Sequence, residues 1–103
     1  VFTQEEQQGA PTAPDAAAAY YAGRWSAKEA VSKCLGTGIG DQCRWCDIEV
    51  LRRATGQPAI RLSGQAQATA AELGIEQVHV TISHERELAC AAAVAEGDQR
   101  KRT

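Results

Sequence analysis

Large apolar side chains are scarce in this sequence. Its 103 residues include two tryptophans, two tyrosines, one phenylalanine and no methionine. Alanine is plentiful, so the core has to be built mainly from Ala, Val, Ile and Leu. A chain of this length buries one modest core and no second one. Because a thin core of small side chains often gains stability from association, we expect one domain that forms oligomers.

The sequence also lacks strong charge and any long apolar run. The formal net charge is −2, which gives no support to a nucleic-acid partner, since such partners require clustered positive charge. No apolar run approaches the roughly 20 residues of a membrane-spanning helix, and no signal peptide opens the chain. We therefore expect a soluble, cytoplasmic protein.

Cysteine is present at four positions, which are Cys34, Cys43, Cys46 and Cys90. Cys43 and Cys46 form a CxxC pair, but a tetrahedral zinc site needs two further ligands. A redox CxxC normally opens a helix after a strand, whereas this pair lies in a predicted loop before a strand. We interpret Cys34 and Cys90 as small buried hydrophobic residues. A zinc or redox protein stays open as a minor alternative.

Two helices and one opening turn of helix are predicted. Residues 1–14 are polar and contain glycine and prolines, which favours a turn of helix followed by a loop. Apolar spacing predicts a long helix from about Asp15 to Leu35, with Asp15 as its N-cap. The glycines within residues 36–40 end it. An alanine-rich helix is predicted over residues 64–73, with Gly74 as the residue that terminates it.

Four strands are predicted from apolar patterns of period two. Residues 47–51 and 59–62 alternate as half-buried strands do, and the turn signal over residues 54–58 joins them in a hairpin. Residues 78–83 form a third predicted strand. Residues 88–95 form a fourth, which is apolar throughout and is therefore predicted to be buried on both faces.

The order of these elements is helix, strand, strand, helix, strand, strand. Such an order predicts an α+β fold in which an antiparallel sheet packs on one long helix. We expect a single domain over residues 1–96, followed by a charged tail over residues 97–103 that is frayed.

The long predicted helix carries a stripe of charged side chains. Helical spacing places Trp25, Glu29 and Lys33 on one line, and Arg24 and Lys28 on a neighbouring line. An ordinary surface ion pair between Glu29 and Lys33 accounts for this spacing. The alternative is chemical: a carboxylate among lysines, next to a glycine-rich loop, suits a magnesium ion that bridges a pyrophosphate, because magnesium prefers oxygen ligands and usually takes only one or two protein carboxylates.

Several stretches match, in order, the motifs of one protein family. The most specific is Trp25 to Lys33, which is similar to a WxxKEAxxK pattern. The others are Val1-Phe2-Thr3 with Glu6 (FT..E), Gly36 to Gly40 (a glycine loop), Asp47-Ile48-Glu49 (DIE), Gly56-Gln57-Pro58 (G-x-P) and Val80 to His84 (VSISH). Together they resemble the holo-acyl-carrier-protein synthases, the short, single-module branch of the 4′-phosphopantetheinyl transferase superfamily.

This resemblance implies a 4′-phosphopantetheinyl transferase fold and a magnesium-dependent enzyme. Its reaction would transfer 4′-phosphopantetheine from coenzyme A to a serine of an apo-acyl carrier protein, in fatty acid or polyketide biosynthesis. The resemblance also implies a homotrimer with active sites between subunits, and neither a nucleic-acid nor a membrane partner. Two alternatives stay open: a transferase module of a larger fatty acid synthase, and a related fold that binds without catalysing.

The resemblance also implies roles for individual residues. Glu29 would be the magnesium ligand, and Lys33 would contact the phosphates and assist the leaving group. The residues that would bind coenzyme A are Arg24, Lys28, Lys33, Gly36, Gly38, Gly56, Pro58 and His84. His79 instead faces away from its apolar neighbours and is predicted at the surface.

The family normally begins with a strand that carries a G-x-D element, whose aspartate is the second magnesium ligand. Val1 aligns after that region, which is on the order of 30 residues long. The resemblance therefore implies an incomplete N-terminus. We expect weak magnesium binding at Glu29, and an exposed sheet edge where that strand would pair.

Overall fold

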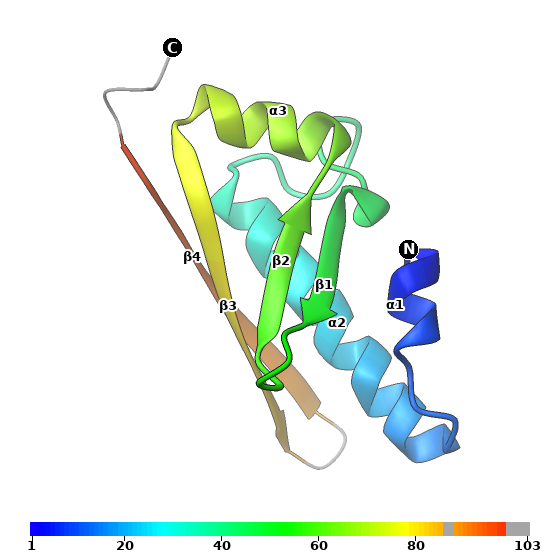
Figure 1. The fold of residues 1–103 in the computed structure, drawn as a ribbon. Helices are drawn as coiled ribbons and strands as arrows, with labels where there is room; N and C mark the ends of the chain where they lie inside the picture. The colour runs from blue at the N-terminus through cyan, green and yellow to red at the C-terminus, as the bar shows by residue number, and fades with distance from the viewer. Residues whose placement is uncertain (86–87, 99–103) are drawn as a thin grey trace.

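The computed structural model in Figure 1 describes residues 1–85 and 88–98. The elements in chain order are α1 (Gln4–Gln8), α2 (Pro14–Cys34), the 3₁₀ turn η1 (Trp45–Asp47), β1 (Ile48–Arg52), β2 (Pro58–Leu62), α3 (Gly64–Glu72), β3 (Ile75–Glu85) and β4 (Leu88–Gly97). This order confirms the predicted α+β architecture. The long helix α2 crosses behind the β1–β2 hairpin, the longer β3–β4 hairpin lies along its other side, and α1 lies beside β1 (Figure 1).

The two ends of α2 have different physical causes. Ala13 is the N-cap residue and makes no side-chain cap, while Pro14 occupies the first helical position. The prediction of Asp15 as N-cap was therefore wrong, because the fixed φ and missing N–H of a proline suit that first position. At the other end Gly36 has a φ of +78°. Glycine reaches this left-handed conformation at little cost, so the helix ends there as predicted.

The strands form two hairpins and not one sheet. β1 pairs antiparallel with β2, with Val50 opposite Ile60, and β3 pairs antiparallel with β4, with Val80 opposite Ala93. β2 and β3 lie near each other, but no ladder joins them within the described residues. The expected single sheet is thus divided, and side chains of β2, α3 and β3 line a hollow at the junction.

The core joins α2, the loop after it, β1 and α3. Its buried cluster consists of Val31, Leu35, Cys43, Ile48, Ala66 and Ala70. The members are small or medium-sized, as the composition predicted. No helix within residues 1–85 and 88–98 combines the length and the apolar character needed to cross a membrane.

β4 has one covered face and one exposed face. Its residues alternate between half-buried positions and exposed ones, and α2 packs along the strand. Leu88 is 65% exposed and Val94 is 63% exposed. The prediction that this strand is buried on both faces was therefore wrong for the single chain, because α2 covers one side only. The strand ends at Gly97, and most of the predicted tail, residues 99–103, lies outside the described residues.

Candidate active site

Glu29 and Lys33 line one open hollow between α2 and β4, with a volume of about 600 Å³. Ser26, three residues before Glu29, and Cys34, the residue after Lys33, line the same hollow. The Ser26 hydroxyl donates to the Ala89 carbonyl at 3.4 Å, and the Cys34 thiol donates to a carbonyl further along β4 at 3.3 Å. These two bonds fix the helix against the strand on both sides of Glu29.

The Glu29 side chain is half-buried and free to bind a ligand. Within residues 1–85 and 88–98 its carboxylate has no hydrogen bond and no ion pair. Lys33 is exposed in the last turn of α2, where the helix dipole favours a cation. Because the two side chains are not paired with each other, the surface ion pair considered from the sequence is not what the structure shows.

A magnesium ion would fit this hollow as a single-carboxylate site. Glu29 offers hard oxygen ligands, and magnesium usually completes its shell with water and substrate phosphates. The part of the chain that the structure describes holds no group of three or more His, Cys, Asp or Glu side chains that could bind a metal. Magnesium at Glu29 would therefore have fewer than three such side-chain ligands among the described residues, and water or phosphate oxygens would complete its shell.

The CxxC pair does not form a site with the other cysteines. Cys43 is buried in the core cluster, whereas Cys46 and Cys90 are exposed. Burial raises the pKa of the Cys43 thiol, which keeps it protonated and weakens it as a metal ligand or nucleophile. The interpretation of Cys90 as a buried residue was wrong, because it lies on the uncovered face of β4.

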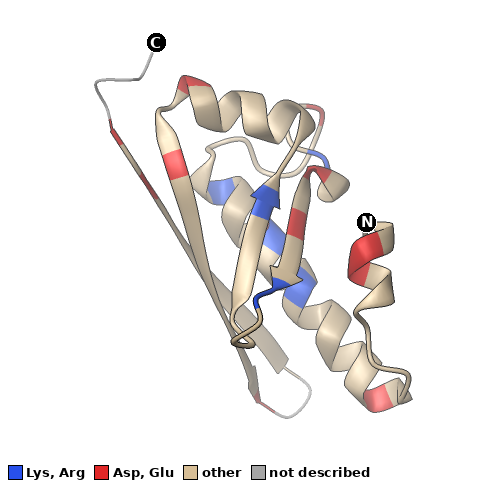
Figure 2. Ribbon diagram, viewed as in Figure 1, with Lys and Arg blue, Asp and Glu red and all other residues tan. Residues whose placement is uncertain are grey.

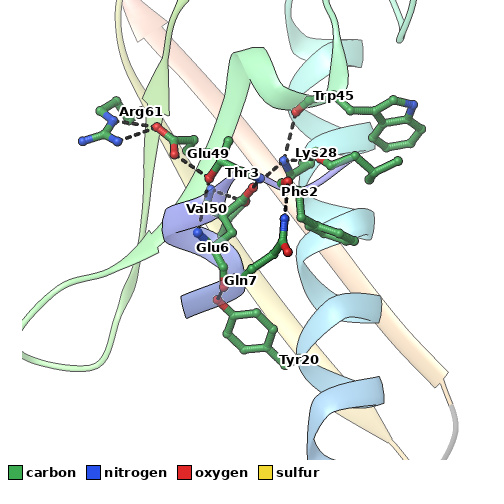
Figure 3. A network of polar contacts seen from close by, with 11 residues as sticks. Phe2, Thr3, Glu6, Gln7, Tyr20, Lys28, Trp45, Glu49, Val50 and Arg61 are labelled. Carbon is green, nitrogen blue, oxygen red and sulfur yellow. Dashed lines mark hydrogen bonds and ion pairs between the residues drawn. The ribbon is translucent and has the colours of Figure 1, made fainter. Parts of the chain in front are cut away.

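Lys28 lies inside the protein, away from the hollow of its neighbour Glu29. Its side chain is fully buried. The ammonium donates to Glu6 Oε1 at 2.7 Å, to the Val1 carbonyl at 2.9 Å and to the Trp45 carbonyl at 2.9 Å (Figure 3). The resemblance had placed Lys28 beside the phosphates, and this geometry does not support that position.

The partner of Lys28, Glu6, connects several elements. Its carboxylate also accepts from the backbone N–H of Thr3 and from that of Val50 on β1, each at 2.9 Å. The Thr3 hydroxyl donates to Glu49, which also accepts from Arg61 (Figure 3). Burial opposes ionisation of Glu49, but the hydrogen bonds from Thr3 and Arg61 outweigh it and lower its pKa. Figure 2 shows the acidic positions of α1 and β1 next to the basic middle of α2.

Arg24 faces a different hollow from that of Glu29. The residue is 6% exposed, and its guanidinium lies 3.6 Å from the centre of the Tyr20 ring. Together with Arg52 it lines a hollow between α2 and β1. Burial lowers the pKa of Arg24. The chain alone therefore does not bring Arg24 to Glu29.

His84 lies on the same side of α2 as Glu29, nearer the start of the helix. Its Nε2 is 2.9 Å from the Ala19 carbonyl, which can only accept, so Nε2 carries the proton. A Cβ at Gly23 would lie 2.8 Å from this nitrogen. The absence of a side chain at Gly23 thus lets the His84 ring approach α2 closely. A glycine inside a helical pattern is a sequence signal of such a close contact, and the prediction of the site from the sequence did not use it. His79 is exposed, as predicted, and lies 3.1 Å from Glu96.

The predicted glycine positions lie in two places. Gly36 and Gly38 follow Lys33 directly, with φ of +78° and +64° and open space around both. Gly56 and Pro58 belong to the β1–β2 turn and its end, and line neither the hollow of Glu29 nor that of His84.

The fold and this hollow define an α+β protein with a candidate site for a metal-bound phosphate on its long helix. The family model of the 4′-phosphopantetheinyl transferase superfamily matches residues 1–99. The chain belongs to this family.

Named relatives and solved structures agree with that membership. The chain is 48% identical over 79 residues to the holo-[acyl-carrier-protein] synthase of Natranaerobius thermophilus, covering 77% of this chain and 62% of that protein. It is 41% identical over 92 residues to the synthase of Alkalilimnicola ehrlichii, covering 89% and 72%.

Among solved structures, the holo-[acyl-carrier-protein] synthase from Neisseria meningitidis superposes with a TM-score of 0.81 at 32% identity, covering 93% of this chain and 76% of that one. The Bacillus anthracis synthase in complex with CoA (3′,5′-ADP) superposes with a TM-score of 0.77 at 34% identity, covering 95% and 77%. The chain thus spans about 62% of the Natranaerobius protein and rather more of the others.

Proposed function

We propose that this chain carries the holo-acyl-carrier-protein synthase reaction, the transfer of 4′-phosphopantetheine from coenzyme A to a serine of an apo-acyl carrier protein. The observation that carries the proposal is the unpaired Glu29 carboxylate, which shares a hollow with Lys33 on the helix that bears the family's most specific motif. Relatives that bear this enzyme's name support it. The cytoplasm, and fatty acid or polyketide biosynthesis as the pathway, belong to the same proposal.

The residues of the hollow would divide the work as follows. Glu29 holds magnesium, which when bound stabilises negative charge on the phosphates. Lys33 contacts the same phosphates and favours departure of the leaving group. The serine oxygen bonds to the phosphorus that carries pantetheine, the bond from this phosphorus to the nucleotide part breaks, and adenosine 3′,5′-bisphosphate leaves together with the serine proton.

A second copy of the chain would complete this site. Gly56 and Pro58, expected at the nucleotide, lie apart from the hollow of Glu29 within one chain. β4 also presents an uncovered apolar row that includes Leu88 and Val94. We infer a homotrimer in which contacts between copies cover this row and bring the two sets of residues together.

The test is the intact mass of an apo-acyl carrier protein after incubation with coenzyme A, Mg²⁺ and this protein in the longest form that its gene encodes. We expect a gain equal to one phosphopantetheine group. Glu29→Gln, which keeps the shape but removes the charge, should abolish the gain. Glu72→Gln, at an exposed position of α3, is the matched control and should retain it. No mass gain with the wild-type protein, or a full mass gain with Glu29→Gln, would refute the proposal.

A further inference from the structure

We propose that Lys28 is a positioning residue for this reaction and not a coenzyme A ligand. It acts through Glu6, and the pair holds the β1–β2 hairpin against the helix that carries Glu29. The catalytic part of this inference rests on the proposed function, whereas the structural part stands without it.

The hydrogen-bond donors of the Lys28 ammonium are all occupied within the protein. A lysine ammonium has three N–H donors and no acceptor. All three are used inside the protein, by one carboxylate and two backbone carbonyls, and none of the side chain is exposed. No donor is left for a phosphate, and the positive charge is already balanced by Glu6 at 2.7 Å.

The pair of Lys28 and Glu6 connects α2 to β1. Glu6 Oε1 receives Lys28 from α2, and Glu6 Oε2 receives the backbone N–H of Val50 from β1. Within residues 1–85 and 88–98, no hydrogen bond runs directly from α2 to β1 or β2. The connection from Lys28 through Glu6 to Val50, which Figure 3 shows as a continuous chain of contacts, is therefore a buried, charged link between the helix and the hairpin, beside the neutral bond from the Tyr20 hydroxyl to the Glu6 carbonyl.

Residues of the proposed site lie on both elements that this link joins. α2 carries Glu29 and Lys33, whereas Gly56 lies in the turn of the β1–β2 hairpin and Pro58 is the first residue of β2. In the proposed function the first two residues hold the phosphates of one coenzyme A, and the last two border the nucleotide of a coenzyme A held by a neighbouring copy. A shift of the hairpin relative to α2 would therefore weaken coenzyme A binding before it changed the chemistry at Glu29.

A labelling experiment on the wild-type protein separates a buried lysine from a ligand lysine. Amines are acetylated with acetic anhydride in large excess over coenzyme A, because the coenzyme A thiol also consumes the reagent. The reaction is run with and without coenzyme A and Mg²⁺, and each lysine is quantified by mass spectrometry. We expect Lys28 to be unreactive under both conditions, and Lys33 to be reactive and protected by coenzyme A. Labelling of Lys28 at the rate of Lys33, with protection by coenzyme A, would overturn the inference. Absence of protection at Lys33 would count against the proposed function instead.

A kinetic comparison tests positioning against a purely structural role. Lys28→Met and Glu6→Gln should each raise the KM for coenzyme A several-fold with a smaller change in kcat, and the double variant should be no worse than either single one, since both remove the same contact. Val31→Ala is the matched control, because this fully buried residue lies on the same helix outside the pair, and it should lower stability without raising KM.

Two other outcomes would contradict a positioning role for Lys28. A raised KM in Lys28→Met alone identifies a direct ligand, and equal KM values in all the variants identify a residue that acts on stability only. Glu6→Gln keeps one amide oxygen as an acceptor, so it remains measurable if Lys28→Met does not fold.

Discussion

Replacing the buried Lys28 by methionine should destabilise the protein more than replacing an exposed charged residue of α2, such as Lys33. The variant keeps an apolar stem of similar length but removes the ammonium, so Glu6 remains buried without its cation. Two backbone carbonyls, those of Val1 and Trp45, lose their donor at the same time. The cost is therefore that of an uncompensated buried charge, to which two unsatisfied acceptors are added.

The magnitude follows from these losses. Removing one partner of a buried ion pair costs about 3 to 5 kcal/mol, a large part of the total of about 5 to 15 kcal/mol that stabilises a typical domain. For a domain of this size, 1 kcal/mol lowers Tm by roughly 4 to 8 °C. Lys28→Met should thus lower Tm by about 12 °C or more. Removing both charges, in Lys28→Met with Glu6→Leu, should cost less than the sum of the two single changes, because no buried charge is left.

The assay is equilibrium unfolding in urea at one fixed protein concentration, since association contributes to the apparent stability of an oligomer. Tryptophan fluorescence reports on Trp25 and Trp45, whose rings lie 5.8 Å apart next to the pair, and far-UV circular dichroism must give the same transition. A loss below about 1 kcal/mol in Lys28→Met, the range of an exposed pair, would refute the buried geometry. Additive losses in the double variant would refute the coupling.

Three further outcomes are expected. The pKa of Glu49 is lower in the folded protein than in the unfolded one, so the unfolded state binds more protons in acid. The free energy of unfolding should therefore fall as the pH drops from about 4.5 through the folded pKa. Urea unfolding at a series of pH values should show a shallower fall in Glu49→Gln than in the wild type, and equal slopes would contradict this. Val94→Lys places a charge on the uncovered row of β4 and should dissociate the proposed trimer, as measured by light scattering after gel filtration. Gln65→Lys, at an exposed position of α3, is the control and should leave the trimer intact. An intact trimer in both variants would exclude this face of β4 as the interface. Gly23→Ala would place a Cβ 2.8 Å from His84 Nε2 and should cost about 1 to 3 kcal/mol in urea unfolding; an unchanged stability would mean that the histidine moves aside freely.

Much of the fold could be predicted because local signals dominate where the elements begin and end. The left-handed backbone at Gly36 after α2 is one that glycine adopts readily, and β1 and β2 lie where the alternating residues predicted strands. The predicted half-buried alternation was wrong for β1, because Ile48, Glu49 and Val50 are all buried. The Glu49 carboxylate is held by Thr3 and Arg61 instead of facing water. The burial of β4 on both faces was predicted wrongly. A strand that is apolar at every position can have its second face covered by its own chain or by a neighbouring copy, and the sequence pattern is the same in both cases.

The position of Lys28 could not be predicted for a different reason. Its helical neighbours suggest an exposed charged line, and Glu6 lies 22 residues earlier in the sequence. Only the tertiary structure brings the two together. Glu29 and Lys33 were placed correctly on one face because four residues make about one helical turn.

The contact between Glu6 and Val50 has a consequence for how the protein can assemble. β1 pairs with β2 along one side, and on its other side the Val50 N–H, which would otherwise be open to a further strand, is occupied by a carboxylate. A second chain that tried to extend the sheet there would have to displace a buried, ion-paired side chain. Growth by strand pairing is thereby discouraged at this border, which is consistent with the proposed trimer, in which copies would meet through the β3–β4 hairpin.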